Sequence, residues 1–288
     1  MGYDAVEFVV KIANFLRSLK LRGVVRQVRA RAALNLFKQL HKNVIHDSRA
    51  LGESMTDWDI SQAHTTTLAQ KVCTSSRELM SDLLELKPDF LHCCFKVIRP
   101  ASNTVKTFEN SEIVTWIRSE PIDSRPNRDR DPNTHPVKEN SVWSALLGCY
   151  DGCYNWSYSK GDYSYNCFAC NDLSKHDDFR SSRVNWRNHY CSALVFPIQY
   201  LTYNEQGEPE KNVIGFLAFD SPQKGAFYNV PDIFDYKDNS EKRAEYRNLL
   251  DKSTAFQIGA VIADTLGVFL QGPYSQNAEY NSKQNKSL

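Results

Sequence analysis

The sequence predicts an α+β fold in which paired strands pack against helices. Two apolar strand-like runs, 193–198 and 213–221, are separated by a short polar segment, and a helix with an apolar stripe follows over 256–266. Earlier in the chain, a helical pattern over 59–86 precedes an apolar run over 90–98. Two apolar runs joined by a polar loop are typical of a hairpin, and the helices on either side need a sheet on which to bury their apolar faces.

The first helix of this fold is predicted over 59–86, where apolar residues recur at three- and four-residue steps. Pro88 marks its end, because proline cannot continue a helix. The run over 90–98 reads as a buried strand whose apolar pattern is interrupted only by His92 and Lys96.

The next predicted elements are shorter. Turn residues at 100–103 favour a hairpin whose second arm is 104–108, and 112–117 fits either a short strand or a helical turn. Residues 120–140 are a charged loop with four prolines, after which Ser141 is expected to cap a short helix over 142–147.

The remaining elements follow from turn and capping signals. Residues 148–190 are rich in aromatic residues and cysteines and show little periodicity. The polar segment 204–211 is the predicted hairpin loop, the closing helix is expected to start near Ser253, and Gly272 with Pro273 supplies its end.

Charge divides the chain into a basic arm and a mildly acidic body. The chain has 288 residues, 41% of them apolar, and a net charge of +1. Residues 1–43 hold nine basic and two acidic side chains, a net of +7, so the remainder carries −6. We expect residues 1–58 to form a basic helical arm and linker, 59–272 the main domain, and 273–288 a disordered tail.

The arm admits two interpretations. Its basic amphipathic helices, predicted over 5–20 and 24–44, pack either on the domain or on a second copy of the chain, or they contact a membrane surface or nucleic acid. No apolar run is long enough to span a bilayer and no secretory signal is recognised. The eight cysteines therefore predict a cytoplasmic protein whose thiols are free or bind metal.

Four local features, in their order along the chain, resemble the GAF domain family. Leu-Val-Phe-Pro-Ile at 194–198 is similar to the family's proline-bearing aliphatic strand, and Ile-Gly-Phe-Leu-Ala-Phe-Asp-Ser at 214–221 to its Ile-Gly-x-Leu-x-x-Asp-Ser strand. Ala-Phe at 226–227 matches a small-plus-Phe pair downstream, and 256–266 resembles the final helix. The resemblance covers about residues 60–271, with its specific matches concentrated after 190.

This resemblance implies a central antiparallel sheet with flanking helices on one face and pocket-forming loops on the other. GAF domains typically sense small ligands such as nucleotides, and their flanking helices often pair two copies and pass a signal to an output domain. No output domain is recognised here, so we expect a regulatory role through a homodimer or a partner protein. The fold and function that the family implies are therefore those of a small-ligand sensor.

Cysteine spacing in the middle segment is compatible with a metal site. The pairs Cys149/Cys153 and Cys167/Cys170 carry four thiols that can close a tetrahedral Zn²⁺ site of structural type. His176 and Cys191 are substitute ligands if one of the four is misassigned. Ordinary packed thiols, a redox sensor and a disulfide are the alternatives, since free cysteine also packs well as a small apolar side chain.

The candidate ligand-binding residues lie in the same part of the chain. Aromatic rings can stack on a planar ligand or fill a loop core, arginines spaced like one helix face can pair with a phosphate or carboxylate or simply face solvent, and an aspartate can accept ligand hydrogen bonds or cap a turn. The predicted set is Trp143, Tyr150, Asp172, Arg183, Trp186 and Arg187.

Catalysis is not expected, because the chain lacks the common nucleophile, phosphate-loop and metalloprotease motifs. Two alternatives to the sensor stay open. One is a non-catalytic GAF-like scaffold held by a four-cysteine zinc site and docked through its basic arm. The other is a thiol-based redox enzyme or sensor, for which Cys191 is the candidate.

Overall fold

A computed structural model describes the body of the chain. The chain divides between residues 56 and 57, and every described residue belongs to the second part. The predicted arm and the predicted disordered tail lie outside the described residues. The described residues are 58–99, 111–119, 134–147, 157–160, 163–177, 179–183, 185–203, 209–232, 245–246, 248–250, 252–264 and 266–267.

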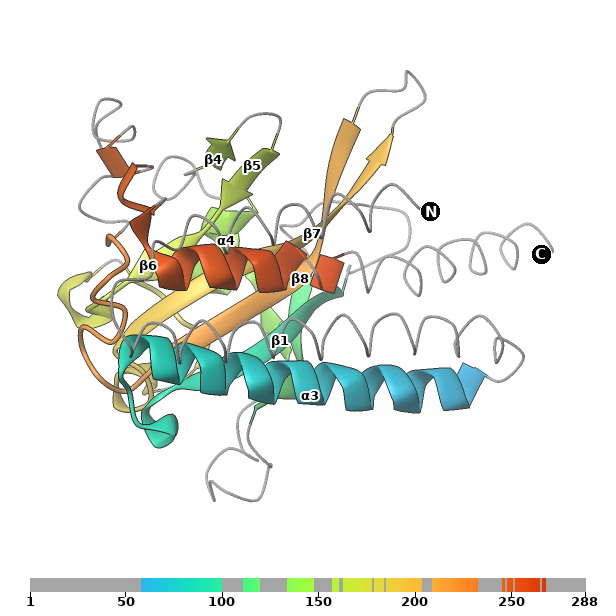
Figure 1. The fold of residues 1–288 in the computed structure, drawn as a ribbon, viewed down its shortest axis with the longest axis horizontal. Helices are drawn as coiled ribbons and strands as arrows, with labels where there is room; N and C mark the ends of the chain where they lie inside the picture. The colour runs from blue at the N-terminus through green and yellow to red at the C-terminus, as the bar shows by residue number, and fades with distance from the viewer. Residues whose placement is uncertain are drawn as a thin grey trace, which may run out of the picture. The chain divides into compact units, whose positions relative to one another are not determined.

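The fold is α+β and is built on an antiparallel six-stranded sheet of order β3-β2-β1-β8-β7-β6 (Figure 1). A separate two-stranded hairpin pairs β4 with β5. The strands are β1 (His92–Arg99), β2 (Glu112–Arg118), β3 (Thr134–Pro136), β4 (Ser157–Lys160), β5 (Tyr163–Asn166), β6 (Phe168–Cys170), β7 (Ser192–Tyr203) and β8 (Pro209–Ser221).

The hairpin predicted around the late polar loop is confirmed. Strands β7 and β8 pair antiparallel along their whole lengths, from Ser192 opposite Ser221 to Tyr203 opposite Pro209. Strand β7 continues beyond its predicted run to Tyr203, and β8 begins inside the predicted loop, so residues 209–211 belong to β8. Strand β1 pairs with the other edge of β8, which places three long apolar strands at the centre of the sheet.

Two long helices cover one face of this sheet (Figure 1). Directly opposed residues of neighbouring strands share a face, and the register places Cys93, Phe219 and Leu194 on one face. Helix α3 (Trp58–Leu84) reaches this face, because the Cys73 thiol donates to the Cys93 carbonyl oxygen at 3.3 Å. The helix predicted over 59–86 is thus confirmed within two residues at each end.

The closing helix, residues 254–264 and 266–267, packs on the same face. Phe196, which shares that face with Leu194 and Phe219, contacts Phe256 with ring centroids 5.8 Å apart. Gly259 lies so close to the sheet that an added Cβ would be 2.2 Å from the Phe196 ring. The helix begins next to Ser253, as predicted, and Ser253 caps it by accepting a hydrogen bond from the Phe256 amide at 3.2 Å.

The other face of the sheet is covered by short elements and loops. They comprise η5 (Val137–Glu139), α4 (Ser141–Leu146), η6 (Leu173–Lys175) and η7 (Trp186–Asn188), while η1 (Pro88–Phe90) links α3 to β1. Trp143 of α4 packs on Phe216 of β8 with ring centroids 4.9 Å apart. Phe216 lies on the sheet face opposite Phe219, so α4 and the two long helices lie on opposite sides of the sheet.

Three local predictions need correction. The strand that pairs with β1 is β2, residues 112–118, rather than the predicted arm 104–108, which lies outside the described residues. Of the two alternatives for 112–117, the strand is confirmed. Asn140, not Ser141, caps α4, because its Oδ1 accepts from the Val142 amide at 3.0 Å, whereas the Ser141 hydroxyl accepts from the Arg180 amide.

The third correction concerns the arginines. Residues 180–183 are irregular and only 186–188 form a short 3-10 turn, so the arginines at 180, 183 and 187 do not share a helix face. Asn185 between them takes a left-handed conformation with φ 55°, which breaks any helix at that point. Across the part of the chain that the structure describes, no helix combines the length and apolar character that crossing a membrane requires.

Candidate functional site

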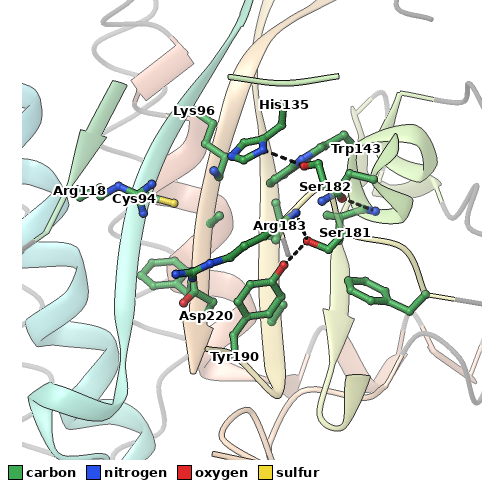
Figure 2. Close-up of a pocket in the computed structure, with 17 residues that line it drawn as sticks. Cys94, Lys96, Arg118, His135, Trp143, Ser181, Ser182, Arg183, Tyr190 and Asp220 are labelled. Carbon is green, nitrogen blue, oxygen red and sulfur yellow. Dashed lines mark hydrogen bonds between the residues drawn. The ribbon is translucent and has the colours of Figure 1, made fainter. Parts of the chain in front are cut away.

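A cavity of about 90 Å³ lies on the sheet face opposite α3 and the closing helix (Figure 2). Its floor is formed by small side chains of the central strands, Cys94, Ala193, Val195 and Ala218, which leave space above the sheet. Its walls come from two loop regions, 135–143 and 179–190. The cavity is smaller than the ~150 Å³ that holds a benzene molecule, so it suits a small molecule or one group of a larger one.

A β-bulge brings two polar residues of β2 to the same face. Cys94 is opposite Arg118, but after the register shift Lys96 is opposite Thr115. Arg118 and Thr115 are three residues apart and would point to opposite faces of a regular strand. Trp116 is the extra residue of the bulge and has no partner on β1. It shifts the alternation of side chains by one residue, so the side chains of Arg118 and Thr115 can both face the cavity.

Positive charge dominates the cavity lining. Lys96, Arg118 and Arg183 contribute three cations against the single carboxylate of Asp220. The Lys96 ammonium donates to Thr115 Oγ1 at 2.9 Å and lies 5.4 Å from the centre of the Trp143 ring, so it is held over the floor. This charge excess favours an anionic ligand.

The Cys94 thiol on the floor is neutral at physiological pH. Burial raises its pKa above the ordinary range, and the Asp220 carboxylate raises it further, while Lys96 and Arg118 oppose the shift without cancelling it. A protonated, buried thiol is a poor nucleophile. Cys94 therefore serves as an apolar part of the floor.

Hydrogen bonds hold the walls of the cavity in place, as Figure 2 shows. The hydroxyls of Ser181 and Tyr190 lie 2.5 Å apart, and Ser182 Oγ lies 2.8 Å from Nδ1 of the buried His135. The second contact joins strand β3 to the segment after β6. Both wall loops are thus tied together across the mouth of the cavity.

Aromatic residues support the wall from behind. Trp186 packs edge-on against Phe179 with centroids 4.8 Å apart, and its ring stacks on Tyr190 at 5.7 Å. Phe179 in turn contacts Phe168 of β6. Phe179 and Tyr190 line the cavity and Trp186 does not, so Trp186 supports the wall from behind.

The structure brings two of the six predicted ligand-binding residues to the cavity, Trp143 and Arg183. Trp186 is buried in the aromatic cluster behind the wall, and Arg187 is exposed and lies over the Trp186 ring at 4.6 Å. Tyr150 lies outside the described residues. The Trp143 indole N–H is buried and has no hydrogen-bond partner among the described residues, so it is available to a ligand.

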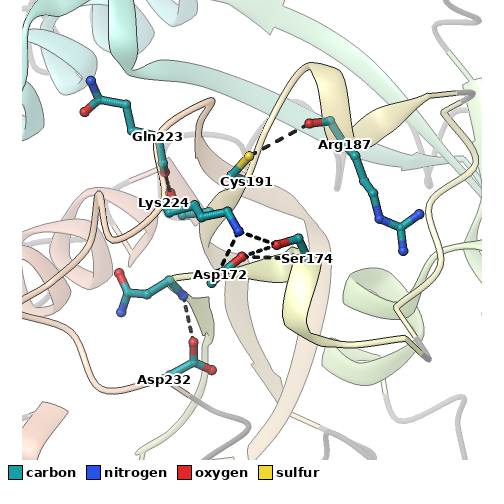
Figure 3. Close-up of polar contacts among 9 residues, drawn as sticks. Asp172, Ser174, Arg187, Cys191, Gln223, Lys224 and Asp232 are labelled. Carbon is teal, nitrogen blue, oxygen red and sulfur yellow. Dashed lines mark hydrogen bonds and ion pairs between the residues drawn. The ribbon is translucent and has the colours of Figure 1, made fainter.

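Asp172 caps a turn outside the cavity lining. Its Oδ1 accepts from the amide of Ser174 at 3.2 Å, and its Oδ2 pairs with Lys224 at 3.1 Å (Figure 3). Burial works to raise the Asp172 pKa, but the hydrogen bonds from Ser174 and Lys224 and the lysine charge outweigh it, so the net pKa is lowered. The carboxylate is therefore engaged in fastening the loop after β8 to the segment after β6.

The sequence analysis did not identify the charged cavity residues Lys96, Arg118 and Asp220 or the cavity histidine, His135. A signal existed for two of them. Lys96 and Asp220 interrupt otherwise apolar strands, and a charged side chain inside a buried strand needs a specific reason to be there. Arg118 and His135 carried no such signal, because their placement depends on the bulge and on loop packing.

The predicted zinc ligands divide between described and undescribed residues. Cys149 and Cys153 lie outside the described residues, so the four-cysteine site stays a prediction. Cys167 and Cys170 are buried free thiols whose pKa values are raised, mainly by burial. Cys170 has a ligand atom within 4.8 Å of His176 and Asp232, in a group that does not include Cys167. This part of the chain can therefore hold a metal ion with a mixed ligand set.

Comparison with known proteins leaves the family open: no protein-family model matches the chain, and no curated protein matches its sequence. The resemblance to GAF domains therefore stays a prediction from the sequence.

Proposed function

We propose that the described body of this chain is a GAF-type sensory domain whose cavity binds a small anionic ligand. The observation that carries the proposal is the cavity with three cations and one carboxylate on the sheet face opposite the two long helices. A ligand bearing a phosphate or carboxylate group suits this lining, because arginine side chains bind both groups through paired hydrogen bonds. A whole nucleotide exceeds the cavity, so its phosphate would be the enclosed part.

Helix α3 is placed to transmit occupancy of the cavity. Gln70 of α3 donates to the carbonyl oxygen of Arg118 at 2.5 Å, and the Thr74 hydroxyl donates to the Ser119 carbonyl at 3.4 Å. Arg118 therefore lines the cavity with its side chain and contacts the helix with its backbone. A ligand that draws Arg118 inward changes the free-energy difference between two positions of α3, which is what coupling between sites requires.

The proposal retains the regulatory setting that the sequence predicts. The signal would pass through helix contacts in a homodimer or with a partner protein, in the cytoplasm, and the basic arm would add a membrane or nucleic-acid contact. The domain would act by binding and not as an enzyme. A thiol-based role at Cys191 is the lesser alternative, and its test is given in the Discussion.

The test is a thermal-shift screen of the full chain against anions. The panel contains inorganic phosphate, sulfate, short dicarboxylates, mononucleotides and cyclic dinucleotides, with neutral sugars and nucleosides as controls. A ligand at 100 times its Kd stabilises the folded state by about 2.7 kcal/mol, which raises Tm measurably. If no anion shifts Tm more than the neutral compounds do, the anion-sensor proposal is wrong.

A matched pair of variants locates the binding. Arg183→Gln removes a cation from the cavity, whereas Arg187→Gln removes a cation from the same loop that is exposed and stacks on Trp186. We expect Arg183→Gln to abolish the anion-induced shift and Arg187→Gln to retain it. Equal loss in both variants would mean that the anion binds the exterior of the loop.

A further inference from the structure

Three potential metal ligands from three different segments meet at the free edge of the sheet. Cys170 is the last residue of β6, His176 follows the 3-10 turn η6, and Asp232 lies beyond the loop that follows β8. The Cys170 sulfur, an imidazole nitrogen of His176 and a carboxylate oxygen of Asp232 all lie within 4.8 Å of one another. Cys170 is fully buried, and the other two residues are half-buried.

The backbone around these residues is firmly held. The Asn171 amide donates to Asp232 Oδ2 at 2.8 Å (Figure 3), and the Asn171 side chain donates to the Val230 carbonyl at 3.1 Å and accepts from the Phe227 amide at 3.0 Å. The Asn171 carbonyl also accepts from the Gly225 amide at 2.7 Å. A single asparagine thus fastens the loop after β8 to the end of β6 and sets the Asp232 carboxylate beside Cys170.

The three side chains suit Zn²⁺ in chemical type and in charge. Thiolate, imidazole and carboxylate are its usual ligands, with bonds of about 2.0–2.3 Å, which places ligand atoms of a tetrahedron about 3.3–3.6 Å apart. Donor atoms already within 4.8 Å reach that geometry through small side-chain rotations. The negative charges of one thiolate and one carboxylate balance the +2 charge of the ion. The half-buried site with its metal therefore has no net charge.

We infer that Cys170, His176 and Asp232 form a Zn²⁺-binding site with a water molecule as fourth ligand. On binding, the Cys170 S–H bond breaks, its proton leaves to solvent and the thiolate electron pair forms the S–Zn bond, while neutral imidazole and the Asp232 carboxylate supply the other two protein ligands. The ion joins the β6 edge to the loop after β8. The site shares no residue with the anion cavity, so the two proposals fail independently.

The test uses the full chain, purified without chelators, with Zn²⁺ and Co²⁺ as probes. Metal analysis after desalting is expected to give about one Zn²⁺ per chain. Replacing Zn²⁺ with Co²⁺ is expected to produce a near-ultraviolet sulfur-to-cobalt charge-transfer band, which reports cysteine ligation directly. No bound metal in the loaded chain, or a cobalt spectrum without that band, overturns the inference.

Variants separate this site from the four-cysteine alternative. We expect C170S to lose the charge-transfer band. We expect H176Q and D232N to weaken Co²⁺ binding by at least about 100-fold, because removing a direct ligand should cost at least as much as removing a residue that only orients a ligand. C167S and the double variant C149S/C153S are expected to keep both metal and band. If C167S and C149S/C153S lose the metal and the band while H176Q binds metal fully, the inference is wrong and four thiolates form the site. D232N changes one atom of a half-buried residue, so the result holds even if C170S fails to fold.

Discussion

Replacing Gly259 with alanine tests how the closing helix packs on the sheet. In a helix without tertiary contacts this change stabilises by about 1 kcal/mol, because glycine is the poorer helix former. Here the new Cβ would lie 2.2 Å from Cε2 and 2.4 Å from Cζ of Phe196. Phe196 is only 2% exposed and packs on Phe256, so its ring has little room to move.

The structure therefore predicts the opposite sign. Overpacking of a buried site costs about 1–3 kcal/mol and more where the neighbours are fixed, so we expect Gly259→Ala to lower the free energy of unfolding by about 1–2 kcal/mol after the helical gain is subtracted. The assay is urea denaturation of the full chain, followed by circular dichroism, with the slope m compared between variants.

A double-mutant cycle identifies the cause. Phe196→Leu removes the two ring atoms that meet the new Cβ and should itself cost about 1–2 kcal/mol. In that background Gly259→Ala should become neutral or stabilising, which gives a coupling energy of about 2 kcal/mol between the two sites. A stabilising Gly259→Ala in the wild-type chain, or a cost that persists without the ring, would refute the proposed helix–sheet contact.

Three further predictions follow from single contacts. Ser253→Ala removes the cap of the closing helix and should cost about 1 kcal/mol in urea denaturation, whereas Ser253→Asn should keep most of the stability; equal losses would show that the cap contributes nothing. Gln70→Ala removes the hydrogen bond from α3 to the Arg118 carbonyl and should lower the free energy of unfolding by about 1 kcal/mol. It should also reduce the anion-induced change in hydrogen exchange of α3, and Lys71→Ala, at an exposed position of the same helix, is the control. An unchanged exchange response would show that α3 does not transmit the signal. Cys191 is half-exposed, whereas the other five described cysteines are buried. Peptide mapping after timed alkylation at neutral pH should therefore show that Cys191 is modified first among the six, and comparable labelling of Cys94 or Cys170 would contradict their burial. An alkylation rate at Cys191 no faster than that of an ordinary exposed thiol would leave the thiol-based function without support.

Much of the framework was predictable because its signals are local. The apolar runs around Phe196 and Phe219, the polar loop between them and the helix start near Ser253 each depend on residues close together in the chain. Strand and helix periodicity act over a few residues, so they can be read before any contact is known. The same holds for α3, whose apolar stripe predicted a buried face.

The cavity was only partly predictable. Trp143 and Arg183 were anticipated as ligand-binding residues, but Trp186 supports the wall and Asp172 caps a turn. Their roles differ because loop packing sets which way each side chain faces, and the irregular segment 179–183 has no period from which that direction could be read.

The sequence by itself determined β1, the late hairpin and the two long helices with their buried stripes, whereas β3 to β6 lie in the segments 120–140 and 148–190, which show no strand periodicity. Tertiary structure alone decided that a bulge opposite Phe95 and Lys96 turns Arg118 toward the cavity, and that Asp232 meets Cys170 instead of Cys167. Periodicity is a property of neighbouring residues. Register shifts and side-chain clusters are settled by contacts between segments far apart in the chain, where the free energy of packing the whole sheet selects among arrangements that are locally equivalent.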